Sequence, residues 1–229
     1  MKSSLNAVAA AIFAVAAVAP ASSYGQAYPS KPIRATIGTP TGGPGDVVLR
    51  GAGLAITNAT GQGFVVENRV GVGSILSMEA CARGAPDGYT LCSCDQQSLA
   101  INPYIRSKLS YPAQDMVPVI LPLVVMLENR TPDLPNVPTY KEAGLDVALV
   151  TWFGLCAPPR TPRDIVQKLN GIVAKGLLGD PELRAKFVLS QGMVIEGAAG
   201  GPPEAFAQHI AAERDRYARI VKITGVRED

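Results

Sequence analysis

Short apolar runs alternate with amphipathic stretches along most of the chain, and glycine- and proline-rich turns separate them. The apolar runs predict strands, and stretches with the period of an α-helix predict helices. This alternation favours an α/β fold with a mainly parallel sheet and helices on both faces. The predicted strands are Ile33–Gly38, Phe64–Asn68, Tyr89–Cys94, Asp146–Leu155 and Met193–Ile195, and the predicted helices span about 46–58, 74–83, 139–143, 161–178, 180 onward and 202–221.

The middle of the chain interrupts this pattern. Residues 117–127 are apolar but contain two prolines, so we interpret them as irregular rather than as a strand. They run into Glu128-Asn129-Arg130 and then into the proline-rich loop 131–138, with no helix or second domain between them.

The first residues have the pattern of a secretory signal peptide. Lys2 precedes the apolar run 7–20, and small residues lead to Gly25-Gln26-Ala27, which predicts cleavage after Ala27. A membrane anchor is the alternative, but the run is shorter than the ~20 apolar residues that span a bilayer. We therefore expect residues 1–27 to be removed and residues 28–229 to be a periplasmic, soluble domain.

Charge and composition argue against several classes of function. The 21 basic and 19 acidic residues are scattered along the chain without a basic block, which argues against nucleic-acid or anionic-membrane binding. The single histidine, His209, belongs to no Ser-His-Asp order that can be placed, and no element carries paired carboxylates. We therefore expect a protein that is not an enzyme and that uses no cofactor.

Four cysteines, Cys81, Cys92, Cys94 and Cys156, would lie in an oxidising compartment after export. Cys92 and Cys94 alternate on one predicted strand and share a face, so either could approach Cys156 if its strand is a neighbour. Buried free thiols are the interpretation that we prefer, and a disulfide stays open. The Cys-x-Cys spacing argues against a zinc site.

The loop 39–45 is the main candidate for ligand binding. It joins the first predicted strand to a helix that starts near Asp46, and unpaired N–H groups at that helix N-terminus suit a carboxylate. Gly42 and Gly43 allow close backbone approach. The alternative is a tight β–α connection with Asp46 as a helix cap, and the loop alone favours neither. A P-loop is excluded because no Gly-Lys-Ser/Thr follows the glycines.

Several short motifs, in order along nearly the whole mature chain, resemble the Bug-type receptors, the extracytoplasmic solute-binding proteins of tripartite tricarboxylate transport. They are Tyr28-Pro29-Ser30-Lys31-Pro32-Ile33-Arg34, Pro40-Thr41-Gly42-Gly43-Pro44-Gly45-Asp46, Val66-Glu67-Asn68-Arg69, Ala85-Pro86-Asp87-Gly88-Tyr89-Thr90-Leu91, Ala100-Ile101-Asn102-Pro103, Leu134-Pro135-Asn136-Val137-Pro138-Thr139 and Trp152-Phe153-Gly154-Leu155.

This resemblance implies a lobe like that of type II periplasmic binding proteins, a small carboxylate ligand and a membrane permease as partner. For Ser98, a role as a helix N-cap is an equal alternative to ligand contact. For Trp152 and Phe153, we prefer packing in the core over a role in the ligand cleft. Family receptors often have an aromatic residue and a proline at positions 39 and 41, so the ligand wall is altered here. The ligand-binding residues that the resemblance implies are Thr39, Thr41, Gly42, Gly43, Asp46, Ser98, Trp152 and Phe153.

The resemblance also implies a deletion. In the family, a second lobe enters after the stretch that corresponds to residues 117–127, whereas this chain lacks that segment between about residues 127 and 131. Two hypotheses follow: an active receptor for small carboxylates, or a degenerate single-lobe protein with weak or no binding. An uncovered apolar seam at residues 117–127 would also favour self-association.

Export is directly testable. Intact-mass measurement of the exported protein is expected to show a mature N-terminus at Tyr28 or within a few residues of it, since the signal pattern ends at Ala27. A full-length species retained in the membrane would contradict this prediction.

Overall fold

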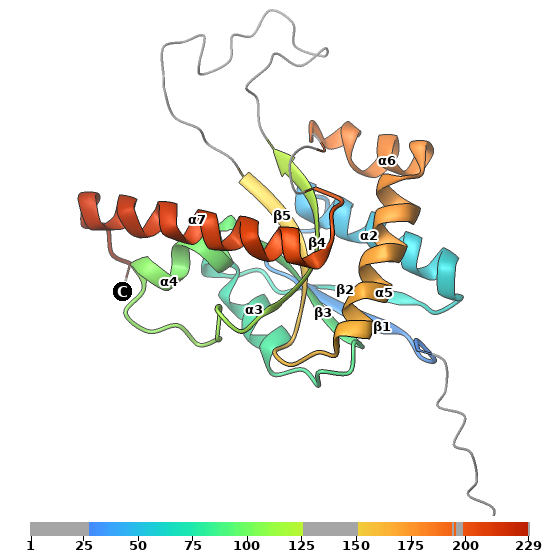
Figure 1. Cartoon of the computed structure of the whole chain (residues 1–229), viewed down its shortest axis with the longest axis horizontal. Coiled ribbons are helices and arrows are strands. Elements are labelled where there is room, and N and C mark those ends of the chain that lie inside the picture. The colour runs from blue at the N-terminus through green and yellow to red at the C-terminus, as the bar shows by residue number, and fades with distance from the viewer. Residues whose placement is uncertain (1–27, 126–150, 194, 196–198, 229) are drawn as a thin grey trace, which may run out of the picture.

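One five-stranded sheet, in the order β2-β1-β3-β5-β4, organises the chain. The computed structural model describes residues 28–125, 151–193, 195 and 199–228 (Figure 1). The strands are β1 (Ile33–Ile37), β2 (Phe64–Asn68), β3 (Thr90–Asp95), β4 (Val117–Val125) and β5 (Thr151–Ala157). The helices are α2 (Pro44–Thr60), α3 (Ile75–Ala82), α4 (Asn102–Ile105), α5 (Arg163–Val173), α6 (Pro181–Phe187) and α7 (Pro203–Thr224), with short helical turns η1 (Val72–Ser74), η2 (Gln97–Ile101), η3 (Ala174–Leu178) and η4 (Leu189–Gln191).

The sheet is mainly parallel, as predicted. Strand β1 pairs in parallel with β2 and β3, whereas β5 runs antiparallel to both of its neighbours, β3 and β4. Four strands therefore point the same way, and their carboxyl ends share one edge. The α/β fold class with helices on both faces is confirmed.

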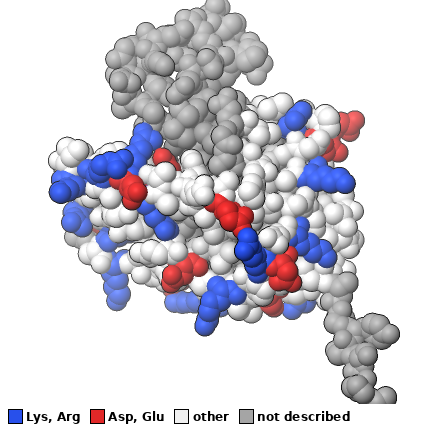
Figure 2. Space-filling view, viewed as in Figure 1, with Lys and Arg blue, Asp and Glu red and all other residues white. Residues whose placement is uncertain are grey.

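Each face of the sheet has its own core. On one face, α2 and α5 bury an aliphatic cluster that includes Ile37, Ile56 and Leu169. On the other, α3 and α7 bury the cysteines together with Trp152 and Phe206. Among the described residues, no helix has the length and apolarity that crossing a bilayer requires. In Figure 2, acidic and basic side chains are interspersed over the visible face.

The interpretation of residues 117–127 as irregular was wrong, because residues 117–125 form strand β4. Proline is excluded from central strands since it cannot donate to the ladder, but an edge strand tolerates it. Strand β4 lies at the edge of the sheet next to β5, and its register shifts after Pro118. The position of the strand in the sheet, which local sequence does not reveal, explains the difference.

The interpretation of the cysteines as free thiols was also wrong. The structure contains two disulfides, Cys81–Cys92 and Cys94–Cys156, with Cα–Cα distances of 5.7 and 6.0 Å. The condition stated for a bond to Cys156 is met, because β3 and β5 are neighbours and Cys94 lies diagonal to Cys156 across the ladder. Cys81 on α3 was not expected to take part in a disulfide.

The remaining sequence predictions had mixed outcomes. The helix predicted over about 74–83 is α3 (Ile75–Ala82), and the hydroxyl of the preceding Ser74 donates to Asp95 Oδ2 at 2.9 Å instead of capping the helix. Met193 and Ile195 are not part of a strand, and Met193 is buried in the aliphatic core. The predicted helix 139–143 and the start of the strand at 146–150 lie outside the described residues.

Gly154 shows how tightly β5 is packed. A Cβ at this position would lie 2.2 Å from Phe206 Cζ and 3.3 Å from Cys94 Sγ. We expect Gly154→Ala to lower the free energy of unfolding by about 1–3 kcal/mol, because the ring must move within a packed core. Urea unfolding measures the change.

Gly171→Ala is the matched control, since it adds the same methyl group in helix α5 with nothing within 4 Å. It is expected to stabilise the protein by about 0.5–1 kcal/mol. Equal effects of the two substitutions would contradict this description of the core.

Candidate functional site

The loop between β1 and α2 lies at the carboxyl edge of the sheet and leads directly into the first turn of α2. Gly42 has φ of 81°, which glycine adopts without strain. Gly43 is the N-cap of α2 and Pro44 its first residue, and no side chain caps the helix. This helix therefore begins without the usual Ser, Thr, Asp or Asn at the cap position.

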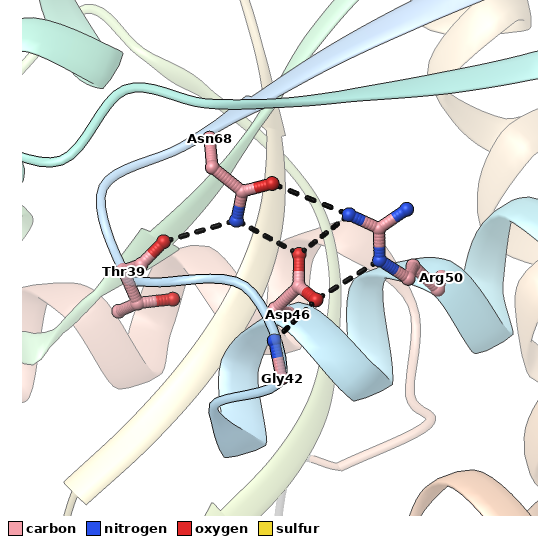
Figure 3. Close-up of polar contacts among 5 residues, drawn as sticks. All are labelled: Thr39, Gly42, Asp46, Arg50 and Asn68. Carbon is pink, nitrogen blue, oxygen red and sulfur yellow. Dashed lines mark hydrogen bonds and ion pairs between the residues drawn. The ribbon is translucent and has the colours of Figure 1, made fainter.

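Asp46, inside the first turn of α2, connects the loop to its surroundings through hydrogen bonds. Its Oδ2 accepts the Gly42 N–H at 2.9 Å and Arg50 Nε at 2.9 Å (Figure 3). Its Oδ1 accepts Arg50 Nη2 at 3.0 Å and Asn68 Nδ2 at 2.9 Å. Asn68 at the end of β2 also donates to the Thr39 carbonyl at 3.0 Å. One buried carboxylate thus fixes the loop to both α2 and β2.

These contacts decide the role of Asp46. Its side chain is 2% exposed and both of its oxygens are occupied, so it stabilises the loop from behind rather than facing a ligand. The connection between β1 and α2 is tight, but Asp46 is not its helix cap, because Gly43 occupies the N-cap position and no side chain caps the helix. Thr41 and Gly42 in the loop are exposed, whereas Gly45 and Asp46 at the start of the helix are buried.

The electrostatics of Asp46 follow from the same contacts. Burial alone would raise the pKa of this carboxyl, but the hydrogen bonds from Arg50, Gly42 and Asn68, together with the Arg50 charge, hold its pKa below the usual range. The hydrogen bond to Asp46 also raises the pKa of Arg50. The pair is therefore ionised at neutral pH, and Arg50 is not a free cation for a ligand.

Backbone donors remain at the start of α2. The N–H groups of Gly45 and Asp46 make no hydrogen bond within the described residues. By helix geometry they point out of the N-terminal end, toward the exposed Thr41 and Gly42. The helix dipole adds a partial positive charge there. The geometry suits one carboxylate group held by backbone N–H donors.

Phe153 is the aromatic residue that reaches this region. It is half-buried, and a Cβ at Gly45 would lie 2.9 Å from its ring. It pairs with Asp95 across the β3–β5 ladder. The structure therefore brings the loop 39–46 and Phe153 together at one edge of the sheet.

The side chains of Ser98 and Trp152 are both fully buried. Ser98 is fully buried, and its hydroxyl and N–H exchange hydrogen bonds of 2.7–3.0 Å with Asp95 in a closed turn. Trp152 is fully buried on the α7 face, with its ring centroid 5.5 Å from those of Phe206 and His209. For Trp152 this is the packing role that the sequence left as an alternative, and neither side chain faces solvent.

Arg50 and Asn68 were not predicted from the sequence as residues of this site. The spacing of Asp46 and Arg50, four residues apart on one helix, is a recognisable signal for a side-chain pair. Asn68 belongs to a motif that had been noted, but its role depends on β2 being the neighbour of β1, which only the fold provides.

The single histidine lies on the other face of the sheet, in contact with Trp152. Burial lowers the pKa of His209, against the opposing effect of Glu213, and its ring packs on Trp152 far from the loop along the chain. In the part of the chain that the structure describes, no His, Cys, Asp and Glu side chains gather in a group that could hold a metal. Beside the loop lies a narrow apolar cavity of 10 Å³, lined in part by Gly45, Val48 and Phe153.

The five-stranded, mainly parallel sheet with helices on both faces is the fold of an α/β lobe of the periplasmic-binding-protein kind. Residues 48–125 and 120–226 match the family described as tripartite tricarboxylate transporter family receptor. The chain belongs to this family, as its motifs predicted.

Curated relatives share this sequence in part. BugT from Bordetella pertussis (strain Tohama I) is 34% identical over 109 residues, which are 45% of this chain and 33% of BugT. The matched part of this chain thus spans about a third of that relative. A UPF0065 protein of the tcbD-tcbE intergenic region of Pseudomonas sp. (strain P51) is 23% identical over 299 residues, which cover 85% of this chain and 87% of the relative.

Solved structures share the fold. The periplasmic binding protein BugD superposes with a TM-score of 0.79 at 19% identity, covering 88% of this chain and 100% of BugD. MatC from Rhodopseudomonas palustris with bound malate gives 0.77 at 20% identity, covering 85% and 100%. R. palustris Rpa4515 with adipate gives 0.77 at 19% identity, covering 87% and 99%.

The Asp46 contacts predict a pH dependence. Because the folded-state pKa lies below the unfolded value, Asp46 contributes stability above about pH 4, and this contribution is lost as the pH falls through the folded pKa. We expect Asp46→Asn to lower the free energy of unfolding by about 1.5–3 kcal/mol at pH 7 and to flatten its decline on acidification. Urea unfolding between pH 3 and pH 7 measures both.

Glu67→Gln is the control for surface carboxylates, because Glu67 pairs with Arg34 and Arg69 at the protein surface. It is expected to cost at most about 1 kcal/mol. An Asp46→Asn variant with the stability and pH profile of the wild type would show that the loop does not depend on this carboxylate.

Proposed function

We propose that this chain is an extracytoplasmic solute-binding protein of a tripartite tricarboxylate transport system, which captures a small carboxylate and presents it to a membrane permease. The observation that carries the proposal is the N-terminus of α2, where the N–H groups of Gly45 and Asp46 have no partner among the described residues and where Asp46 holds the preceding loop in place. Family membership supports it, as do the solved structures of MatC with bound malate and of Rpa4515 with adipate.

The proposal includes export, with cleavage of a signal peptide on the N-terminal side of Tyr28. Tyr28, the residue after the proposed cleavage point, packs into the fold: its hydroxyl donates to the Gly88 carbonyl at 2.7 Å and its ring lies 5.1 Å from that of Tyr89. A processing site inside this contact would remove part of the folded domain. These contacts support cleavage on the N-terminal side of Tyr28.

We also propose that the chain lacks most of the second lobe of its family. Only residues 126–150 connect β4 to β5. The two segments that match the family overlap at residues 120–125. The alignment with the Pseudomonas relative spans 299 residues and is therefore longer than this chain of 229 residues, so this chain has gaps in that alignment. A single lobe would leave the ligand on an open surface.

The open surface sets the expected affinity. A hydrogen bond to a charged group contributes about 1.5–3 kcal/mol, and less when water has access. Immobilising a small ligand costs at least about 4 kcal/mol, so one or two backbone contacts leave little net binding. We therefore predict that malate or adipate binds more weakly than about 1 mM. The amide resonances of Gly45 and Asp46, followed by NMR during titration, measure it site by site.

Two glycines at opposite ends of α2 provide the matched variants. Gly42 and Gly61 both have positive φ and nothing within 4 Å of an added Cβ, so substitution by Ala costs a similar backbone strain at each. Gly42→Ala is expected to abolish the shifts and Gly61→Ala to retain them. Absence of shifts in the wild type at saturating malate, adipate and citrate would leave the degenerate alternative standing. Micromolar binding would show that another surface completes the site.

A further inference from the structure

The two disulfides connect different parts of the fold. Cys81–Cys92 joins α3 to the strand β3 that follows it, with a sequence separation of 11. Cys94–Cys156 joins β3 to β5, with a separation of 62. The second bridge therefore crosses the junction at residues 126–150, on whose two sides the family-matched segments lie.

Strand β5 depends on the Cys94–Cys156 disulfide for its position in the sheet. It enters the sheet between β3 and β4, antiparallel to both, although β4 precedes it in sequence. Closing β3 onto β5 must therefore enclose β4 and its connections in one long loop. Such non-local closure is costly in chain entropy, and a covalent bond that spans it removes that cost from the folding reaction.

The bridge also lies directly behind the candidate site. Cys94 immediately precedes Asp95, and Asp95 pairs with Phe153, whose ring packs on Gly45 at the start of α2. Gly154, opposite Cys94 in the ladder, leaves room for the bridge and for Phe206. The Cys94–Cys156 disulfide therefore fixes strand β5, which carries Phe153, the aromatic residue packed against the start of α2.

We infer that this chain is oxidation-dependent in its folding, and that Cys94–Cys156 is the bridge that matters most. In the chain-entropy description, a bridge over 62 residues lowers the unfolding equilibrium constant by about a thousandfold and one over 11 residues by about a hundredfold. The chain stays largely unfolded while its cysteines are reduced, and folds where they are oxidised.

The oxidant is a small-molecule or protein disulfide, which is the chemistry of thiol–disulfide exchange. A cysteine thiolate attacks one sulfur of the reagent and displaces a thiolate, and the second cysteine of the pair then displaces the other. Each protein bridge that forms reduces one reagent disulfide to two thiols. With glutathione disulfide, two equivalents are consumed for the two bridges.

The test compares two double variants of the exported chain. Cys94→Ala/Cys156→Ala and Cys81→Ala/Cys92→Ala each remove two fully buried sulfurs from the same core cluster. The cavity and transfer costs are therefore matched, and the difference between the variants isolates the closed loop. Fluorescence of Trp152, the single tryptophan of the sequence, reports on that cluster.

Urea unfolding is expected to give a tenfold or larger difference in the unfolding equilibrium constant, with the variant that lacks Cys94–Cys156 the less stable. Wild-type protein unfolded with reductant is expected to refold with a glutathione redox buffer and not with excess reductant. Peptide mapping by mass spectrometry is expected to find the two pairings of the structure.

Three outcomes would overturn the inference: refolding of the reduced wild type to the same midpoint, equal or inverted stability of the two variants, or different pairings. Should the Cys94–Cys156 variant fail to fold at all, the wild-type refolding and the peptide map still decide. None of these measurements involves a ligand, so the inference fails or holds independently of the proposed function.

Discussion

The insertion of β5 between β3 and β4 is the constraint on which the rest of this fold depends. It is the one strand that runs against the others, and it places Phe153 beside the N-terminus of α2 and Trp152 in the core beneath α7. The helices that follow it, α5 and α7, then cover the two faces of the sheet. A chain whose β3 and β5 separated would lose both cores and the floor of the candidate site.

The candidate site combines a rigid frame with an open surface. Asp46 uses its full hydrogen-bonding capacity inside the protein, since Gly42, Arg50 and Asn68 occupy both of its oxygens. The positive end of α2 is left to backbone N–H groups. This division suits recognition of a carboxylate by shape and dipole rather than by a charged side chain, and it leaves affinity to whatever covers the open side.

Local sequence predicted those features that local interactions determine. The βα alternation from β1 to β3 and the amphipathic α5 and α7 were predicted from periodicity, and the loop before α2 from its glycines and proline. The family motifs, in their order, led to the receptor family. The sequence suggested Asp46 as a ligand contact or as a helix cap, and its role as a buried anchor of the loop was not predicted.

What the sequence did not reveal depends on neighbours distant along the chain. Strand β4 contains two prolines and is tolerated because it lies at an edge. Asn68 reaches Asp46 only because β2 pairs with β1. Cys81 finds Cys92 only once α3 packs on the sheet. Trp152 could face a cleft or the core, and the strand register turned it toward α7.

The most direct test of a carboxylate-binding lobe is a crystal structure of the exported chain with malate at high concentration. The expected result is a malate carboxylate within hydrogen-bond distance of the Gly45 and Asp46 N–H groups, with the Asp46–Arg50–Asn68 contacts unchanged. Ordered malate at another place on the molecule, with the N-terminus of α2 still free, would contradict it.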